Sequence, residues 1–181
     1  HCKHQCPFCE EVGQPQYPFD PLRDLVSLHY DCAADPDDFV SSAADRALLE
    51  ATHGTTWLRE HVVPVVGVFG QNVEYQRDRC ERVALAVWGD VTEPLRASLA
   101  YGNRSQADVV IAANRPLRLR TAEYVAQRWA MVLSNGGQVY VKEGGQSDFT
   151  KLIVEALQRA SIHPGISKCV HVVQHSKWNE D

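Results

Sequence analysis

Residues 25–38 read LVSLHYDCAADPDD, a run rich in valine and leucine followed by four aspartates within eight residues. The apolar half is typical of a buried β-strand. Carboxylates this close raise one another's pKa, and a cation that neutralises them relieves the repulsion. Hard oxygen ligands of this kind suit Ca²⁺ or Mg²⁺. The alternative is a solvated acidic turn in which Asp35 or Asp37 caps the following helix.

Beyond this stretch, segments with strand-like and helix-like patterns alternate. Apolar residues at helical spacing predict helices over 40–53, 80–88, 121–133 and 149–160. Short apolar runs predict strands over 62–69, 108–113, 138–142 and 168–174, with 90–107 as loop. This alternation predicts an α/β fold with a mostly parallel sheet and helices on both faces. Ligands bind such sheets at the carboxyl ends of the strands.

The composition restricts the classes of function. The chain has 181 residues, 44% of them hydrophobic and 23% charged, which is ordinary for one globular domain. Its net charge of -5 argues against nonspecific nucleic-acid binding, which needs a basic face. No apolar run approaches the ~20 residues of a membrane span. We therefore expect neither a nucleic-acid nor a membrane partner.

Residues 1–24 are expected to form a Cys/His-rich segment and a Pro-rich linker ahead of the α/β domain at 25–181. A possible zinc site follows from the C-x-x-C spacing near the start, with candidate ligands Cys2, His4, Cys6 and Cys9. The same spacing also resembles the iron–sulfur motif of radical S-adenosylmethionine enzymes, although no glycine-rich methionine-binding motif follows. Disulfides are a further alternative. Cys80 and Cys169 are expected to be small buried core residues.

The order of the polar loops after the predicted strands resembles the nucleoside hydrolase superfamily, as a divergent nucleoside-hydrolase-like protein without its C-terminal part. That family opens with a strand followed by D-x-D-P-G-x-D-D, and Asp31, Asp37 and Asp38 fall at matching positions. Gly70-Gln71-Asn72 is similar to its Gly-Asn motif before a helix. Residues 144–148, GGQSD, match its G-P-L-T-N motif in place and partly in character.

The resemblance implies Ca²⁺-dependent hydrolysis of an N-ribosidic bond in a nucleoside or a related ribosylated compound. The calcium ligands that it implies are Asp31, Asp37 and Asp38 together with the carbonyl of Ser147. The catalytic candidates, for water activation and for leaving-group chemistry, are Asp31, Asp35, Asp37 and His175. The expected substrate contacts are Asn72, Asn179 and Glu180, although Asn72 has a helix N-cap as its equal alternative.

Two departures from the family pattern leave other functions open. The second aspartate of the first motif falls on Ala33, for which Asp35 is the substitute, and the family's late His-Asp pair has no counterpart. The alternatives are a non-catalytic nucleoside- or sugar-binding module and a zinc-stabilised interaction module. A truncated sheet exposes apolar surface, so we expect a homo-oligomer or a partner chain to cover it. His29 and His171, within strands, are expected to be hydrogen-bonded structural histidines.

Overall fold

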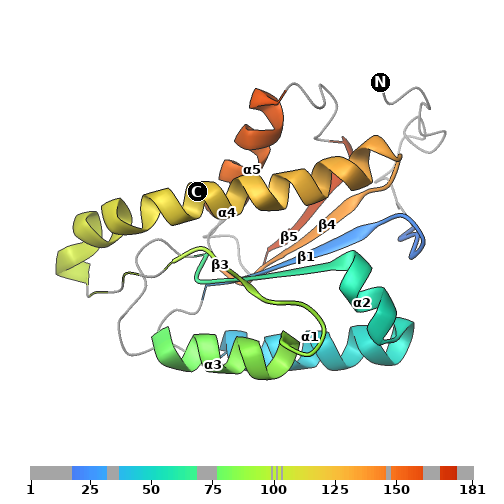
Figure 1. Ribbon diagram of the computed structural model, residues 1–181, viewed down its shortest axis with the longest axis horizontal. Coiled ribbons are helices and arrows are strands. Elements are labelled where there is room, and N and C mark those ends of the chain that lie inside the picture. The colour runs from blue at the N-terminus through green and yellow to red at the C-terminus, as the bar shows by residue number, and fades with distance from the viewer. Residues whose placement is uncertain are drawn as a thin grey trace.

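The structure is a computed structural model and describes residues 18–31, 37–68, 77–98, 100, 102, 104–145, 148–160 and 168–174. In these residues the chain forms one five-stranded sheet in which every pairing is parallel. The strands are β1 (Leu25–Tyr30), β2 (Val62–Val66), β3 (Leu95–Arg96), β4 (Val139–Glu143) and β5 (Val170–Gln174). Their order is β3-β2-β1-β4-β5, so β1 lies at the centre (Figure 1). The predicted α/β fold is confirmed.

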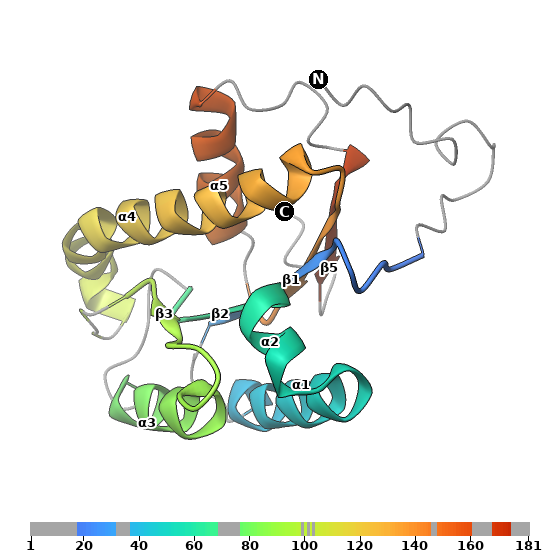
Figure 2. The same ribbon diagram turned by 45° about the vertical axis from the view of Figure 1, so that its right-hand side comes forward.

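Helices cover both faces of the sheet, as predicted. On one face lie α1 (Asp37–His53), α2 (Thr55–His61) and α3 (Arg77–Trp88); on the other lie α4 (Ala107–Ser134), preceded by the short 3₁₀ turn η2 (Arg104–Gln106), and α5 (Asp148–Arg159). Figures 1 and 2 show this three-layer arrangement from two directions. No helix in the described part of the chain is both long and apolar enough to span a bilayer.

The sheet divides the interior into two hydrophobic cores. Successive side chains of a strand point to opposite faces. Leu25 of β1 therefore joins the core under α4 and α5, where Trp129 and Ile153 are fully buried. Leu28 joins the core under α1 and α3, where Trp88 is fully buried. Because both faces are covered, β1 and β2 read as nearly continuous apolar runs.

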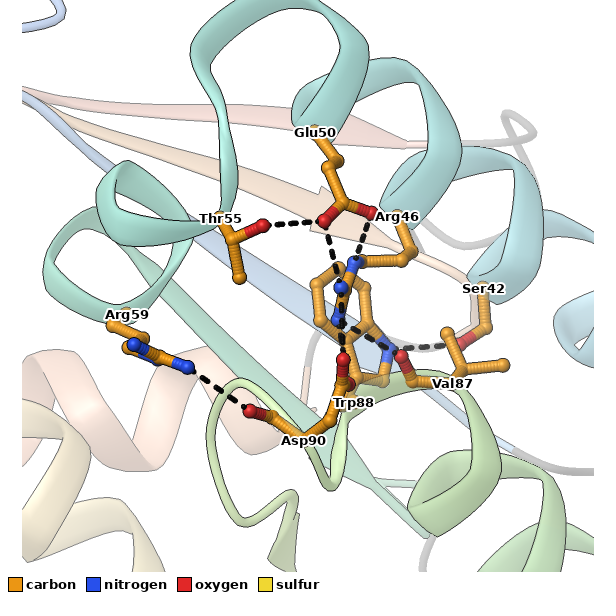
Figure 3. Close-up of polar contacts among 8 residues, drawn as sticks. All are labelled: Ser42, Arg46, Glu50, Thr55, Arg59, Val87, Trp88 and Asp90. Atoms are coloured by element: carbon orange, nitrogen blue, oxygen red, sulfur yellow. Dashed lines mark hydrogen bonds and ion pairs between the residues drawn. The ribbon is translucent and has the colours of Figure 1, made fainter.

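Arg46 fixes α1 against the end of α3 (Figure 3). Its guanidinium donates to both carboxylate oxygens of Glu50, at 3.0 and 3.1 Å, and to both of Asp90, at 3.0 and 3.3 Å. It also donates to the carbonyl of Val87 at 3.1 Å, while the Trp88 indole donates to Ser42 Oγ at 2.9 Å. The helix that begins with Asp37 is thus held along its length.

The largest error of the sequence prediction concerns 108–113, predicted as a strand. These residues form the first part of α4, a helix of 28 residues with Pro116 in its interior. A short apolar run does not distinguish a strand from a buried helix, and the following proline favoured termination. Asn114 instead lies inside the helix, where its side chain accepts from Ala100 N–H and donates to Ala100 C=O, both at 2.7 Å. The helix predicted over 121–133 is the second half of α4.

Three smaller differences concern β3, α2 and the cysteines. β3 lies in the region expected to be loop, and α2 was not predicted. Cys80 is 2% exposed and belongs to the core, as expected, but it is also disulfide-bonded, with a partner that is not among the described residues. Cys169, expected to be buried, is half-buried and packs against the other core.

Candidate functional site

The strand order makes the carboxyl ends of β1 and β4 the topological switch point of the sheet. After β1 the chain turns to α1 on one face, and after β4 it turns to α5 on the opposite face (Figure 1). In parallel sheets, ligands bind at such a switch point because the two departing connections leave space between them. Asp31 directly follows β1, Asp38 lies in the first turn of α1, and Gly144 and Gly145 directly follow β4.

Two carboxylates from the predicted acidic loop lie against this glycine pair. A Cβ built on Gly144 would be 2.3 Å from Asp38 Oδ1, and one built on Gly145 would be 2.5 Å from Asp31 Oδ2. Any side chain at either position would therefore displace a carboxylate. The absence of side chains on the two glycines allows Asp31 and Asp38 to approach the same turn.

The third predicted ligand, Asp37, has a different environment from that of Asp38. Asp37 is exposed and its Oδ1 accepts the backbone N–H of Asp38 at 2.8 Å, whereas Asp38 is 3% exposed. A carboxylate in the first turn satisfies helix N–H groups and interacts favourably with the helix dipole. Asp37 thus lies in the first turn of α1 with one oxygen on the N–H of the next residue, and Asp31 and Asp38 are the pair that faces the glycines.

On the face covered by α4 and α5, a buried polar chain runs beneath this edge. Ser27 Oγ lies 3.0 Å from His29 Nε2, and His29 Nδ1 lies 2.9 Å from Thr150 Oγ1 and 3.3 Å from Glu143 Oε1. Thr150 Oγ1 donates to Glu143 Oε1, and Trp129 Nε1 donates to Ser27 Oγ at 3.3 Å. His29 is thus a hydrogen-bonded core histidine, as predicted.

The same residues have the order of a Ser-His-Glu catalytic triad, but their burial argues against nucleophilic catalysis. Ser27 and His29 are 0% exposed and Glu143 is 1% exposed, so no substrate carbonyl reaches the serine hydroxyl in this conformation. Sequence reasoning missed Ser27, Glu143 and Thr150. The one available signal was the pair of polar residues at 27 and 29, which share a face of an otherwise apolar strand.

A buried cation lies beside this chain. Arg118 of α4 is 5% exposed; its guanidinium donates to Asp148 Oδ2 at 2.6 Å and to the carbonyl of Val68. Burial lowers the pKa of Arg118, and the Asp148 charge opposes that shift. Desolvation raises the pKa of Asp148 although 47% of its side chain is exposed; Arg118 opposes this shift and the Glu143 charge adds to it. Arg118 thereby joins the segment after β2 to the start of α5.

On the face covered by α1, a second polar group lies at the same carboxyl ends of β1 and β4. Tyr30 donates to Asp45 Oδ2 at 2.8 Å, and Lys142 Nζ contacts both Asp45 oxygens at 2.6 and 2.8 Å. The pKa of Tyr30 is raised well above 10.0, first by burial and then by the Asp45 charge, with a smaller contribution from Asp38. The ends of β1 and β4 are therefore tied together on both faces of the sheet.

Two carboxylates of the acidic loop, Asp31 and Asp38, lie at this turn among the described residues. The described residues contain no group of three or more His, Cys, Asp or Glu side chains placed to hold a metal. Asp31 and Asp38 offer hard carboxylate oxygens at one turn, whereas Ca²⁺ takes 6–8 oxygens. The other candidates lie outside the described residues: Asp35, Asn72, Ser147, His175, Asn179 and Glu180, and the zinc candidates Cys2, His4, Cys6 and Cys9.

Comparison of the chain with protein-family models, with curated proteins and with solved structures found no match. The nucleoside hydrolase resemblance therefore stays a prediction from sequence motifs.

Proposed function

We propose that this chain binds Ca²⁺ through Asp31 and Asp38 and hydrolyses an N-ribosidic bond in a nucleoside or a related ribosylated compound. The observation that carries the proposal is the approach of both carboxylates to the Gly144–Gly145 turn at the switch point between β1 and β4. Carboxylates from two different segments repel one another in such a place, and a divalent cation relieves the repulsion. Both residues also match the aspartate motif that the sequence shares with nucleoside hydrolases.

The chemistry assigns different tasks to the two carboxylates. N-ribosidic cleavage passes through an oxocarbenium-like sugar, as in glycoside hydrolysis, and needs a positioned water. Bound Ca²⁺ would orient that water and lower its pKa. Asp38, buried in the first turn of α1, is the better ligand. Asp31, half-buried at the strand end, is the candidate to accept the proton of the attacking water.

A non-catalytic sugar- or nucleoside-binding module is the second candidate, and a specific observation favours it. Asp37, which the resemblance gave to the metal and to catalysis, uses one oxygen to accept the N–H of Asp38. Together with Ala33 in the family's aspartate position, this reduces the number of carboxylates at hand for water activation. Such a module would bind Ca²⁺ and a ribosylated ligand without turnover.

A second copy of the chain is the partner we propose for the edge strand β5. Within the described residues β5 pairs with β4 alone, and its side chains Val172 and Val173 are 42% and 64% exposed. An edge strand with exposed apolar residues is a template for pairing. Light scattering that gives a concentration-independent monomer mass would contradict this assignment.

Calorimetric titration with Ca²⁺, followed by a ribohydrolase assay, tests the proposed function. Elemental mass spectrometry first reports the calcium and zinc content of the purified chain. We expect one Ca²⁺ per chain, at least tenfold weaker binding in Asp38→Asn, and release of reducing sugar from at least one ribonucleoside. The matched control is Glu123→Gln, which removes one charge from the exposed surface of α4 and should bind like the unchanged chain.

Each outcome decides between the candidates. Calcium binding with sugar release that disappears in Asp31→Asn supports the hydrolase. Calcium binding that strengthens ribonucleoside binding without sugar release supports the binding module. Absence of Ca²⁺ binding, or equal binding by Asp38→Asn and the unchanged chain, overturns the assignment of the carboxylate pair.

A further inference from the structure

We propose that Thr150 and Glu143 are positioning residues: a buried chain of hydrogen bonds that ends on Glu143 holds the Gly144–Gly145 turn at its place beside Asp31 and Asp38. The inference rests on the proposed function, because cation binding is the property that the position of the turn would serve. It concerns residues that touch neither the cation nor the substrate and act through the turn.

The direction of the hydrogen bonds follows from the chemistry of the two ends. A carboxylate only accepts, so the single hydroxyl hydrogen of Thr150 goes to Glu143 and Thr150 Oγ1 accepts from His29 Nδ1–H. His29 Nε2 then accepts the Ser27 hydroxyl hydrogen at 3.0 Å. An indole N–H only donates, and Trp129 gives its hydrogen to Ser27 Oγ. Every donor in the chain is used, and the Nδ1–H tautomer of His29 is assigned.

The chain joins four elements inside the protein. Ser27 and His29 belong to β1, Trp129 to α4, Glu143 to β4 and Thr150 to α5, and none of the five is more than 6% exposed. Among the described residues, Glu143 Oε2 has no hydrogen-bond partner. A buried carboxylate with one unsatisfied oxygen lowers stability compared with an apolar residue of similar size. Stability alone therefore does not explain the residue, whereas fixed geometry does.

Glu143, at the end of this series of hydrogen bonds, is directly connected to the candidate site. Glu143 pairs with His29 in the parallel register, and Gly144 N–H donates to the His29 carbonyl at 2.7 Å. The turn is thus tied to β1 through a backbone bond and, one residue earlier, through the side chains of His29 and Thr150. Because a carboxylate oxygen lies only 2.3 Å from a Cβ position of Gly144, a small movement of the turn changes the space around Asp38.

Two substitutions at Thr150 separate positioning from stability. Thr150→Val keeps the shape of the side chain and removes its hydroxyl, whereas Thr150→Ser keeps the hydroxyl and removes a buried methyl group. We expect at least tenfold weaker Ca²⁺ binding in Thr150→Val and less than a twofold change in Thr150→Ser, even though Thr150→Ser lowers the Tm. Calcium affinity that follows the Tm of the two variants, with no dependence on the hydroxyl, would overturn the positioning role.

Amide hydrogen exchange of Gly144, measured by NMR, gives a readout that does not need calcium. We expect at least tenfold faster exchange of the Gly144 amide in Thr150→Val than in Thr150→Ser, since the bond to the His29 carbonyl opens more often. Equal exchange in both variants refutes the positioning role. If the unchanged chain does not bind Ca²⁺, the proposed function fails, while the exchange rates still decide whether Thr150 holds the turn.

Ser27→Ala provides a second variant, at the opposite end of the buried series of hydrogen bonds, should Thr150→Val fold poorly. It removes the donor to His29 Nε2 and leaves Thr150 and Glu143 in place. Nitrogen-15 spectra of the unchanged chain should show His29 as the Nδ1–H tautomer, and Ser27→Ala should shift the Nε2 resonance. An Nε2–H tautomer in the unchanged chain would contradict the assigned direction.

Discussion

A methyl group at position 144 would occupy space that the Asp38 carboxylate now fills. In Gly144→Ala the added Cβ would lie 2.3 Å from Asp38 Oδ1 and 3.0 Å from the His29 carbonyl oxygen. Ordinary contact begins at 3.4 Å, so the carboxylate must move by about 1.1 Å, or the turn must move away from β1. Overpacking of this kind costs about 1–3 kcal/mol of unfolding free energy.

The effect on cation binding should exceed the effect on folding. Binding constellations tolerate displacements of about 0.5 Å, so a movement of this size would take Asp38 out of the geometry proposed for Ca²⁺ binding. We expect at least tenfold weaker Ca²⁺ binding, equivalent to about 1.4 kcal/mol. Calorimetric titration measures the affinity, and denaturant unfolding followed by circular dichroism measures the stability.

Gly136→Ala is the matched control for this substitution. Gly136 has φ of 77° and nothing within 4 Å of a built Cβ. It lies in the turn between α4 and β4, at the end of the strands opposite the candidate site. An alanine there is strained by about 1–2 kcal/mol but meets no neighbour. It should lower stability and leave Ca²⁺ affinity unchanged. Normal calcium binding by Gly144→Ala, or an equal loss of binding in Gly136→Ala, would refute the carboxylate arrangement.

Three further substitutions test the packing and the polar contacts. Ile153→Ala empties part of the core under α4 and should lower the unfolding free energy by about 2–5 kcal/mol, with unchanged Ca²⁺ affinity of the folded chain in a calorimetric titration. Arg46→Lys loses the forked contacts with Glu50 and Asp90 and should lower the Tm, more at low than at high salt. Because the folded-state pKa of Tyr30 is raised above 10.0, its contribution to stability is present below pH 10 and is lost as the pH rises further. Tyr30→Phe should therefore show a smaller decrease in Tm above pH 10 than the unchanged chain, and identical pH profiles would contradict this assignment.

The sheet was largely predictable because its strands are short apolar runs with clear ends. The run at 25–30 is followed by aspartate and the run at 139–143 by two glycines, so local composition placed the carboxyl ends of these strands to within one residue. The apolar run at 109–111 carried no such information, since its neighbours in space decide between strand and helix. Val110, Asn114 and Arg118 are buried at intervals of four residues, which is the spacing of a helix face and not of a strand.

The candidate site was predictable in part, for a similar reason. Asp31 and Asp38 are close in sequence and follow a strand, so both the cluster and its place at the sheet edge could be inferred. The buried chain was not predictable, because His29 and Thr150 are 121 residues apart and meet only after the crossover through α4. Glu143 resembles an ordinary charged residue at a strand end until its burial is known.

Removal of the proposed Ca²⁺ should leave the fold intact, and this expectation follows from the two polar groups at the end of β1. Asp45 joins Tyr30 to Lys142 on one face, and the buried chain joins His29 to Glu143 on the other, so protein contacts alone hold the carboxyl ends of β1 and β4 together. A chelator should therefore leave the far-ultraviolet circular dichroism unchanged and lower only the Tm. The decrease in stability should follow ligand linkage, about 2.7 kcal/mol relative to Ca²⁺ at 100 times its Kd. Unfolding on addition of chelator would show instead that the cation, and not the two hydrogen-bonded groups, holds the carboxyl ends of β1 and β4 together.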